Sequence, residues 1–175
     1  MRGLYHVGFA VADVEAARAA VGRTLSVEFG PAKSRQIGAW VTRVALSVEG
    51  PPFLELIEGP PGSPWHTPDG PRFDHLGVWS ADLVSDRDVL AARGCRLVFD
   101  GPRAGLPMTF HEVPELGARI EAVDGPMVRS LLLAEGTMAD PLTTALHLGG
   151  APGSDQPPNH GGRPTTAFAP GTEEP

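Results

Sequence analysis

The sequence contains a single cysteine, Cys95, among its 175 residues. An internal disulfide is therefore impossible, and we expect the chain to work in a reducing compartment. No stretch approaches the roughly 18 apolar residues that a membrane-spanning helix needs, and no apolar segment of the signal-peptide kind precedes the first motif. These absences lead us to expect a soluble cytoplasmic protein.

The sequence also has fewer basic than acidic residues: 14 Lys and Arg against 21 Asp and Glu, which gives a formal net charge of −7. This balance argues against nucleic-acid backbones and anionic membrane surfaces as main partners. Hydrophobic residues make up 41% of the chain and charged residues 20%. Both fractions are typical of a globular protein, and the length is sufficient for a substantial core.

The sequence does contain one short motif that occurs twice. Residues 6–14 read His-Val-Gly-Phe-Ala-Val-Ala-Asp-Val, and residues 75–83 read His-Leu-Gly-Val-Trp-Ser-Ala-Asp-Leu. Each copy is followed by a short apolar segment that contains a glutamate at its second position and ends in glycine, at residues 54–59 and 120–125. Each half of the chain thus carries one histidine and one glutamate at matching places.

Both copies predict the order strand, helix and three strands. In the first copy we expect strands at residues 4–11, 26–29, 40–49 and 53–58, with a helix from residue 14 to about 21 that Asp13 caps. In the second we expect strands at residues 74–80, 96–100, 108–113 and 118–124, with a helix capped by Asp82 or Ser85 that runs to residue 93. The modules then span residues 3–62 and 72–135. Residues 136–175 are rich in Pro and Gly and are expected to form a flexible tail.

The repeated His and Glu residues suit a metal site. A carboxylate in an apolar strand is costly to bury unless it is paired, protonated or bound to a cation. Two neutral imidazoles and two carboxylates favour a divalent first-row ion such as Ni, Co, Zn, Mn or Fe. In an octahedral shell, His6, Glu55, His75 and Glu121 leave two adjacent positions for neighbouring oxygens of a substrate. Alternatively, the repeat preserves only the fold, and these residues are caps or edge residues.

Four further residues are candidates for catalysis or substrate binding. His111 precedes Glu121 by one strand, and hairpin pairing could bring it to the site as a general acid or base. Trp79 lies on the same predicted strand face as His75, so its ring either packs against the substrate or fills the core. The same two alternatives hold for Phe110. Arg119 could pair with a substrate carboxylate, neutralise Glu121 or reach solvent.

The chain resembles the vicinal oxygen chelate superfamily, which includes glyoxalase I, methylmalonyl-CoA epimerase, extradiol dioxygenases and bleomycin resistance proteins. The resemblance covers residues 3–135 and is carried by residues 6–13, 54–58, 73–77 and 120–121. It implies an α+β fold in which two βαβββ modules form a cupped mixed sheet around one divalent metal ion. It also implies that His6, Glu55, His75 and Glu121 match the four ligand positions. In glyoxalase-like chemistry a glutamate ligand shuttles the substrate proton, with Glu121 as the first candidate and Glu55 as the second.

Within the superfamily, a His-Glu-His-Glu set looks most like glyoxalase I. The epimerase pattern usually has Gln in place of Glu55 and an acidic base upstream, whereas residues 32–45 contain no acid. We therefore expect a redox-neutral isomerase, epimerase or lyase that acts through a metal-chelated enediolate on a small molecule with vicinal oxygens. The resemblance also implies a homodimer. The alternatives are a cyclase or lyase of secondary metabolism on the same metal site, an Fe(II) extradiol-type dioxygenase, and a metal-free drug-binding resistance protein.

Overall fold

The chain repeats one order of secondary structure elements. The computed structural model describes residues 3–128, so the predicted tail and the end of the second predicted module, residues 129–135, lie outside the described residues. The first half comprises β1 (Leu4–Ala10), α1 (Val14–Leu25), β2 (Lys33–Ile37), β3 (Trp40–Leu46) and β4 (Phe53–Glu58). The second half comprises β5 (Arg72–Ser80), α2 (Leu83–Ala92), β6 (Arg96–Asp100), β7 (Met108–Val113) and β8 (Ala118–Asp124), with short 3₁₀ turns at Gly101–Ala104 and Pro114–Leu116.

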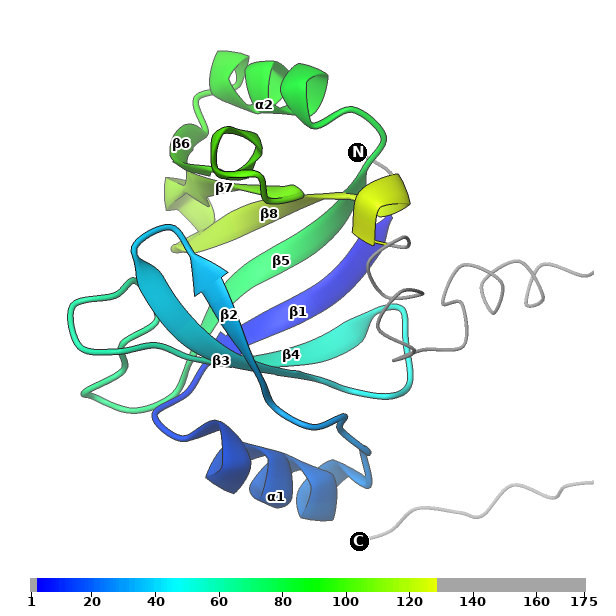
Figure 1. Cartoon of the computed structure of the whole chain (residues 1–175), viewed down its shortest axis with the longest axis vertical. Helices are drawn as coiled ribbons and strands as arrows, with labels where there is room; N and C mark the ends of the chain where they lie inside the picture. Colours follow the sequence, from blue (N-terminus) through cyan, green and yellow to red (C-terminus); the bar gives the residue numbers. More distant parts are fainter. Residues whose placement is uncertain (1–2, 129–175) are drawn as a thin grey trace, which may run out of the picture.

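Within residues 3–128 the strands form one curved eight-stranded sheet in the order β2-β3-β4-β1-β5-β8-β7-β6 (Figure 1). The central strands β1 and β5 are antiparallel, whereas β1 with β4 and β5 with β8 are parallel. This arrangement places equivalent strands of the two halves on either side of the β1–β5 pair. The expected α+β fold of two βαβββ modules in a cupped sheet is confirmed.

The helices lie outside the curve of the sheet, α1 and α2 at opposite ends of the molecule (Figure 1). Asp13 caps α1 by accepting hydrogen bonds from the backbone N–H groups of Glu15 and Ala16, at 2.9 and 3.0 Å. Asp82 caps α2 in the same way through Ser85, at 3.0 Å. Both caps satisfy amide groups that would otherwise lack partners. Within residues 3–128, no helix has the length and hydropathy needed to cross a membrane.

The strand expected at residues 26–29 is wrong. Helix α1 continues to Leu25, and Ser26 ends it in the left-handed conformation with φ of 56°. Phe29 makes only an isolated bridge to Ser47, and the strand that follows the helix is β2. This edge strand begins with four polar residues and has three exposed side chains in succession, so it lacks the apolar alternation that marks a half-buried strand.

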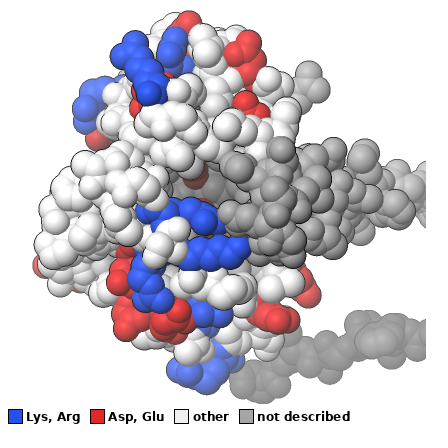
Figure 2. Space-filling model, viewed as in Figure 1, with Lys and Arg blue, Asp and Glu red and all other residues white. Residues whose placement is uncertain are grey.

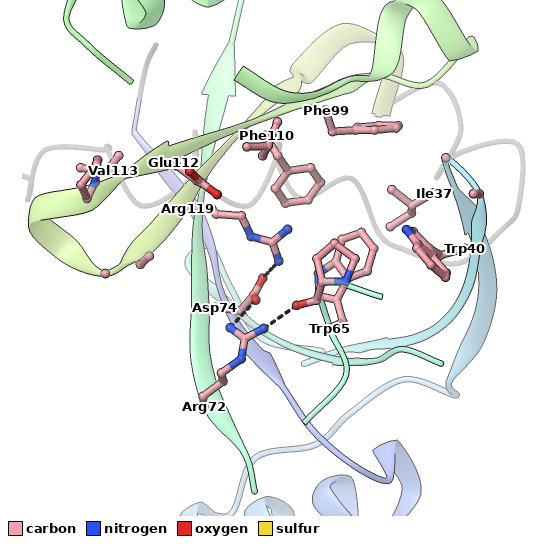
Figure 3. Close-up of a pocket in the computed structure, with 17 residues that line it drawn as sticks. Ile37, Trp40, Trp65, Arg72, Asp74, Phe99, Phe110, Glu112, Val113 and Arg119 are labelled. Carbon is pink, nitrogen blue, oxygen red and sulfur yellow. Dashed lines mark hydrogen bonds and ion pairs between the residues drawn. The ribbon is translucent and has the colours of Figure 1, made fainter. Parts of the chain in front are cut away.

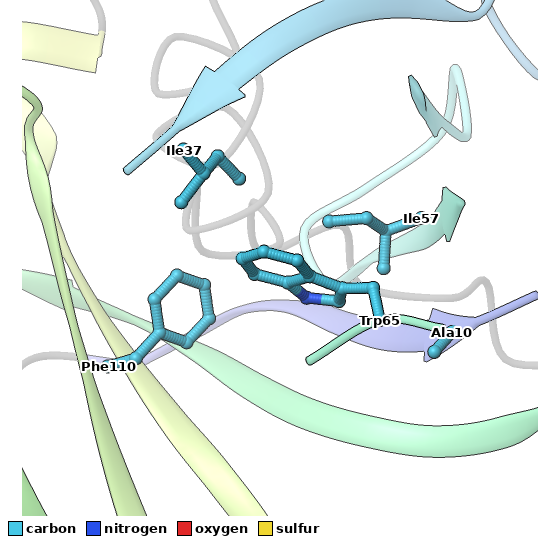
Figure 4. Packing of buried hydrophobic residues seen from close by; sticks show 5 residues of the cluster. All are labelled: Ala10, Ile37, Ile57, Trp65 and Phe110. Carbon is cyan, nitrogen blue, oxygen red and sulfur yellow. The ribbon is translucent and has the colours of Figure 1, made fainter. Parts of the chain in front are cut away.

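The linker between the halves contributes to the core inside the cup. Trp65 is buried there, and its indole packs among side chains from both halves (Figure 4). The buried members of this cluster are Ala10, Ile37, Ile57, Trp65 and Phe110. Because Phe110 comes from the second half and the three aliphatic residues from the first, Trp65 ties the two halves together at one end of the cup.

Candidate metal centre

The four repeated His and Glu residues converge at the centre of the sheet. They come from its four middle strands, with His6 on β1, Glu55 on β4, His75 on β5 and Glu121 on β8. In the register of these strands, Gly8 lies opposite both Glu55 and His75. All four residues are buried. The sheet therefore brings together residues that lie up to 115 positions apart.

The donor atoms of these side chains lie within 4.8 Å of one another. The two Nε2 atoms of His6 and His75 are 2.8 Å apart. Glu121 Oε2 lies 2.8 Å from the first of these nitrogens and 3.3 Å from the second. The oxygens of Glu55 lie farther out, at 3.5 Å from His6 Nε2 and 3.7 Å from His75 Nε2.

These spacings fit a single small cation. With metal–ligand distances of about 2.0–2.2 Å, adjacent donors of one ion stand about 3 Å apart and opposite donors about 4.3 Å apart. The separations given above, 2.8–3.7 Å, lie close to the value for adjacent donors. Two nitrogen and two oxygen donors also form a set that divalent transition metals accept. The residues present thus fit one divalent ion.

A glycine from the opposite half makes room for each imidazole. A Cβ placed on Gly8 would stand 2.2 Å from Cε1 of His75, and one placed on Gly77 would stand 2.3 Å from Cε1 of His6. No heavy atom is tolerated at such distances. The glycine that follows each histidine by two positions is therefore a steric requirement of the paired site.

The residue before each histidine is bulged out of the β1–β5 ladder. The register shifts between Leu4 and His6, which leaves Tyr5 unpaired, and again opposite Asp74, which lies between the paired residues Phe73 and His75. A bulge breaks the alternation of faces along a strand. Tyr5 and Asp74 both contact the neighbouring imidazole as a result, although alternation alone assigns them to the opposite face.

Asp74 holds the ring of His75. Its Oδ2 lies 2.9 Å from His75 Nδ1, and the carboxylate also accepts hydrogen bonds from Arg72, at 2.7 Å, and from Arg119. The side chain of Asp74 is completely buried. A carboxylate on Nδ1 directs the lone pair of Nε2 toward the cluster, as in carboxylate–histidine–metal arrangements. In contrast, Nδ1 of His6 has no hydrogen-bond partner within residues 3–128.

Tyr5 is the second site residue that the sequence did not reveal. Its ring packs edge-on against His6, with centroids 4.7 Å apart, and lies 3.9 Å from the ring of Trp79. Burial raises the pKa of its phenol, and the negative charges of Glu55 and Glu121 raise it further. Tyr5 therefore keeps its proton and remains a hydroxyl donor beside the cluster.

The cluster stabilises positive charge. Burial raises the pKa of Glu55. Burial acts in the same direction on Glu121, but the charges and hydrogen bonds of His6 and His75 outweigh it and lower the pKa of Glu121 to about 2. Burial disfavours protonation of His75, yet hydrogen bonds to Asp74 and Glu121 and the charge of Glu55 raise its pKa to about 10. Carboxylates thus favour a proton on His75 for the same electrostatic reason that they favour a metal cation.

A pocket of about 560 Å³ adjoins the cluster on the far side of Phe110 and Asp74 (Figure 3). The ring of Phe110 meets that of His75 edge-on, with centroids 5.4 Å apart. Arg119 lies in the same wall and pairs with Asp74, not with Glu121. Phe110 therefore contacts His75 directly and Arg119 reaches it through Asp74, whereas Trp79 is connected to the cluster through Tyr5.

His111 is not brought to the cluster. Its neighbour Phe110 lies opposite Glu121 in the β7–β8 ladder, whereas His111 lies opposite Ile120, so the imidazole points to the other face of the sheet. There it is buried within hydrogen-bonding distance of Thr109 Oγ1, at 3.2 Å. Burial lowers its pKa, which keeps the ring neutral. The hairpin pairs as expected, but it turns this side chain away.

On the face seen in Figure 2, Lys and Arg side chains gather on the β2–β3 side of the cup, beside a hollow in the surface. The net charge of the chain is negative, so this basic region is local. It lies on the same side of the molecule as the β2–β3 turn that borders the pocket.

Comparison with known proteins agrees with the observed fold. The family model described as Glyoxalase/Bleomycin resistance protein/Dioxygenase superfamily matches residues 5–110. No curated protein matches the sequence. Among solved structures, methylmalonyl-CoA epimerase from Mycobacterium tuberculosis is 24% identical with a TM-score of 0.55, and the alignment covers 70% of this chain and 87% of that one.

Two further solved structures share the fold. A variant of Streptomyces coelicolor methylmalonyl-CoA epimerase in complex with 2-nitronate-propionyl-CoA is 16% identical, with a TM-score of 0.53 and coverage of 70% of this chain and 98% of that one. A hypothetical protein from Bacillus halodurans is also 16% identical, with a TM-score of 0.56 and coverage of 70% and 93%.

Proposed function

Because the chain belongs to the glyoxalase/bleomycin resistance protein/dioxygenase superfamily, we propose that it is a divalent-metal-dependent enzyme that catalyses a redox-neutral reaction next to a carbonyl group. The observation that carries this proposal is the convergence of four donor side chains, two from each half, within 4.8 Å. His6, Glu55, His75 and Glu121 would hold the ion. A divalent ion there supplies a Lewis acid that polarises a carbonyl and lowers the cost of negative charge on its oxygen.

The proton transfer is assigned to Glu121 first and to Glu55 second. A carboxylate of Glu121 removes a proton from the carbon next to the carbonyl, and the electron pair of that C–H bond moves toward the carbonyl oxygen. Return of the proton to the other face of the same carbon gives an epimerase, and return to the neighbouring carbon gives an isomerase. Loss of a leaving group from the adjacent carbon instead gives a lyase.

The surrounding residues support binding of a small molecule with vicinal oxygens. Tyr5 is a protonated hydroxyl beside the cluster, and Phe110 excludes water from one side of His75. We retain Phe110 and Arg119 as substrate-binding candidates because both line the adjoining pocket, and Trp79 because it packs on Tyr5. His111 is assigned no catalytic role. The homodimer and the cytoplasmic location stay predictions.

A cyclase or lyase of secondary metabolism on the same metal site is the second candidate. The observation that favours it is the adjoining pocket, whose aromatic walls suit a larger planar substrate. An extradiol-type dioxygenase differs from both candidates because it consumes oxygen. A drug-binding resistance protein differs because it requires no metal.

Elemental analysis of the purified protein and of two variants tests the metal site. We expect about one divalent ion per chain in the natural protein and in His66→Ala, whose histidine is exposed in the linker, and loss of the ion in His75→Ala. Metal retention by a folded His75→Ala protein would overturn the proposal.

Proton exchange then tests the reaction class. α-Hydroxy ketones and 1,2-dicarbonyl compounds are incubated with the loaded enzyme in deuterated water, and the α-carbon signals are followed by NMR. We expect enzyme-dependent deuterium incorporation without oxygen uptake. Oxygen uptake in place of exchange identifies a dioxygenase, and neither activity together with tight, metal-independent binding of an aromatic drug identifies a resistance protein.

A further inference from the structure

The pocket beside the metal centre is bounded by both halves of the chain. One wall comes from the β2–β3 turn and Trp40, and the other from β6, β7 and β8 (Figure 3). The two walls approach each other at Gly38, where a Cβ would stand 3.2 Å from the ring of Phe99. The residues that line the pocket do not include His6, Glu55, His75 or Glu121. Its volume, about 560 Å³, is within the range of small-molecule sites.

The charged side chains of the described lining, Arg72, Arg119, Asp74 and Glu112, balance one another, and Arg96, which pairs with Glu112 from outside, leaves the group with one positive charge in excess. Asp74 is shared by two guanidinium groups, those of Arg72 and Arg119. The other acidic residue of the lining, Glu112, pairs with Arg96 outside the pocket, at 3.0 Å from its Nε. The pocket therefore favours a ligand with a single negative charge.

Arg119 supplies that charge in a partly desolvated setting. Its side chain is only 12% exposed, and within residues 3–128 it donates to Asp74 alone, through one terminal nitrogen. The remaining N–H groups of the guanidinium are available to a second acceptor. A charge-assisted hydrogen bond at such a site is stronger than one in open solvent.

The walls around this guanidinium are aromatic. Its carbon lies 5.1 Å from the ring centroid of Trp65 and 5.0 Å from that of Phe110, so two rings hold it in place. Trp40 and Phe99 complete the aromatic lining. The indole N–H of Trp65 is buried and has no hydrogen-bond partner within residues 3–128. Flat apolar walls beside the remaining N–H groups of Arg119 suit a planar ring that carries an acceptor.

We propose that this pocket binds a planar aromatic carboxylate, whose anionic group pairs with Arg119 and whose ring packs against Trp40, Trp65 and Phe99. The site is separate from the metal ligands and requires no metal ion. Its occupation can therefore be measured on metal-free protein. Failure would remove the pocket from the substrate-binding part of the proposed function but would leave the four-donor metal site standing.

Isothermal titration of chelator-treated full-length protein with 2-naphthoate tests the proposal. Removal of the metal ensures that chelation does not contribute to the signal. The neutral isostere 2-naphthamide has nearly the same shape but lacks the charge, so we expect it to bind about tenfold more weakly, which corresponds to about 1.4 kcal/mol. Quenching of tryptophan fluorescence by the ligand reports contact with the aromatic walls.

Two variants of equal charge separate pocket binding from nonspecific attraction. Arg119→Gln should weaken 2-naphthoate binding about tenfold and abolish the preference over the amide, whereas Arg103→Gln, whose side chain is 84% exposed, should leave both unchanged. If Arg119→Gln fails to fold because Asp74 loses its partner, Trp40→Leu tests the aromatic wall instead, since this substitution leaves the ion pairs of Asp74 in place. Equal affinity for naphthoate and naphthamide, or no binding of naphthoate at millimolar concentration, would overturn the proposal.

Discussion

Gly8 of β1 leaves the space that the imidazole of His75 occupies, because a Cβ at Gly8 would lie 2.2 Å from Cε1 of that ring. Gly77 of β5 stands in the same relation to His6. Each histidine of the site thus depends on a glycine of the other half. The donor set is complete only when β1 and β5 pair in the observed register, so the metal centre and the interface between the halves form together.

We predict that Gly8→Ala removes metal binding. The new methyl group must displace the ring of His75, and this movement disturbs the contacts of the ring with Asp74 and Phe110. Overpacking of this kind costs about 1–3 kcal/mol of the free energy of unfolding. Metal content by elemental analysis and the thermal unfolding midpoint measure the two effects.

The control for this substitution is Gly30→Ala. A Cβ on Gly30 would have its nearest neighbour, the carbonyl oxygen of Leu46, at 3.7 Å, which is ordinary contact. Metal content should stay at the level of the natural protein. Full metal occupancy in Gly8→Ala would show that the ring of His75 can move without losing the ion.

The convergence of His6, Glu55, His75 and Glu121 was predictable from the sequence because the chain repeats these residues. His6 and His75 are followed by the same glycine, and Glu55 and Glu121 lie in matching apolar phrases. Paired strands of a duplicated unit bring equivalent positions together, so the repetition carries long-range information that a single motif lacks. The helix caps were predictable for a local reason, since Asp13 acts on residues two and three positions away.

The residues that sequence reasoning missed depend on non-local pairing. Tyr5 and Asp74 reach the site only because each is bulged in the β1–β5 ladder, and a bulge is not visible in the alternation of either strand. The same alternation rule gives the correct faces of Phe110 and His111. Hairpin pairing alone places His111 close to Glu121 along the sheet, and only the alternation of faces shows that its imidazole points away.

Asp74→Asn should weaken metal binding about 10- to 100-fold. The amide is a weaker partner for Nδ1 of His75 than the carboxylate, and it no longer fixes which ring nitrogen carries the proton. A competitive titration of zinc against a chromophoric chelator measures the affinity. Asp69→Asn, at an exposed position of the linker, is the matched control. Equal zinc affinity of the two variants would assign Asp74 a purely structural role.

The metal-free protein should lose stability as the pH rises from 6.5 to 10. The pKa of His75 is raised from its usual 6.5 to about 10 in the folded state, so its contribution is fully present below 6.5 and is lost as the pH passes through 10. Glu121 acts in the other direction: its pKa is lowered from 4.5 to about 2, and its contribution is lost only as the pH falls through that range. Unfolding midpoints across the alkaline range measure the effect.

The metal-loaded protein is the comparison for this pH series. A metal ligand must be deprotonated, so His75 carries no proton to lose once the ion is bound, and the alkaline decline should be smaller. His75→Gln without metal should likewise lack the decline. A decline of equal size in all three samples would place its origin elsewhere in the protein.

Glu121→Gln and Glu55→Gln should separate the proton shuttle from the second carboxylate ligand. Glu121 Oε2 is the oxygen that lies closest to both imidazoles, whereas the oxygens of Glu55 stand 3.5 and 3.7 Å away. A glutamine keeps a carbonyl oxygen but cannot accept the substrate proton. We therefore expect Glu121→Gln to lower α-proton exchange about 10²- to 10⁴-fold, and Glu55→Gln to lower it less.

Metal content of both variants, measured alongside, distinguishes loss of the base from loss of the ion. Exchange that survives in Glu121→Gln but fails in metal-loaded Glu55→Gln would transfer the role to Glu55, whose pKa burial already raises toward that of an effective base.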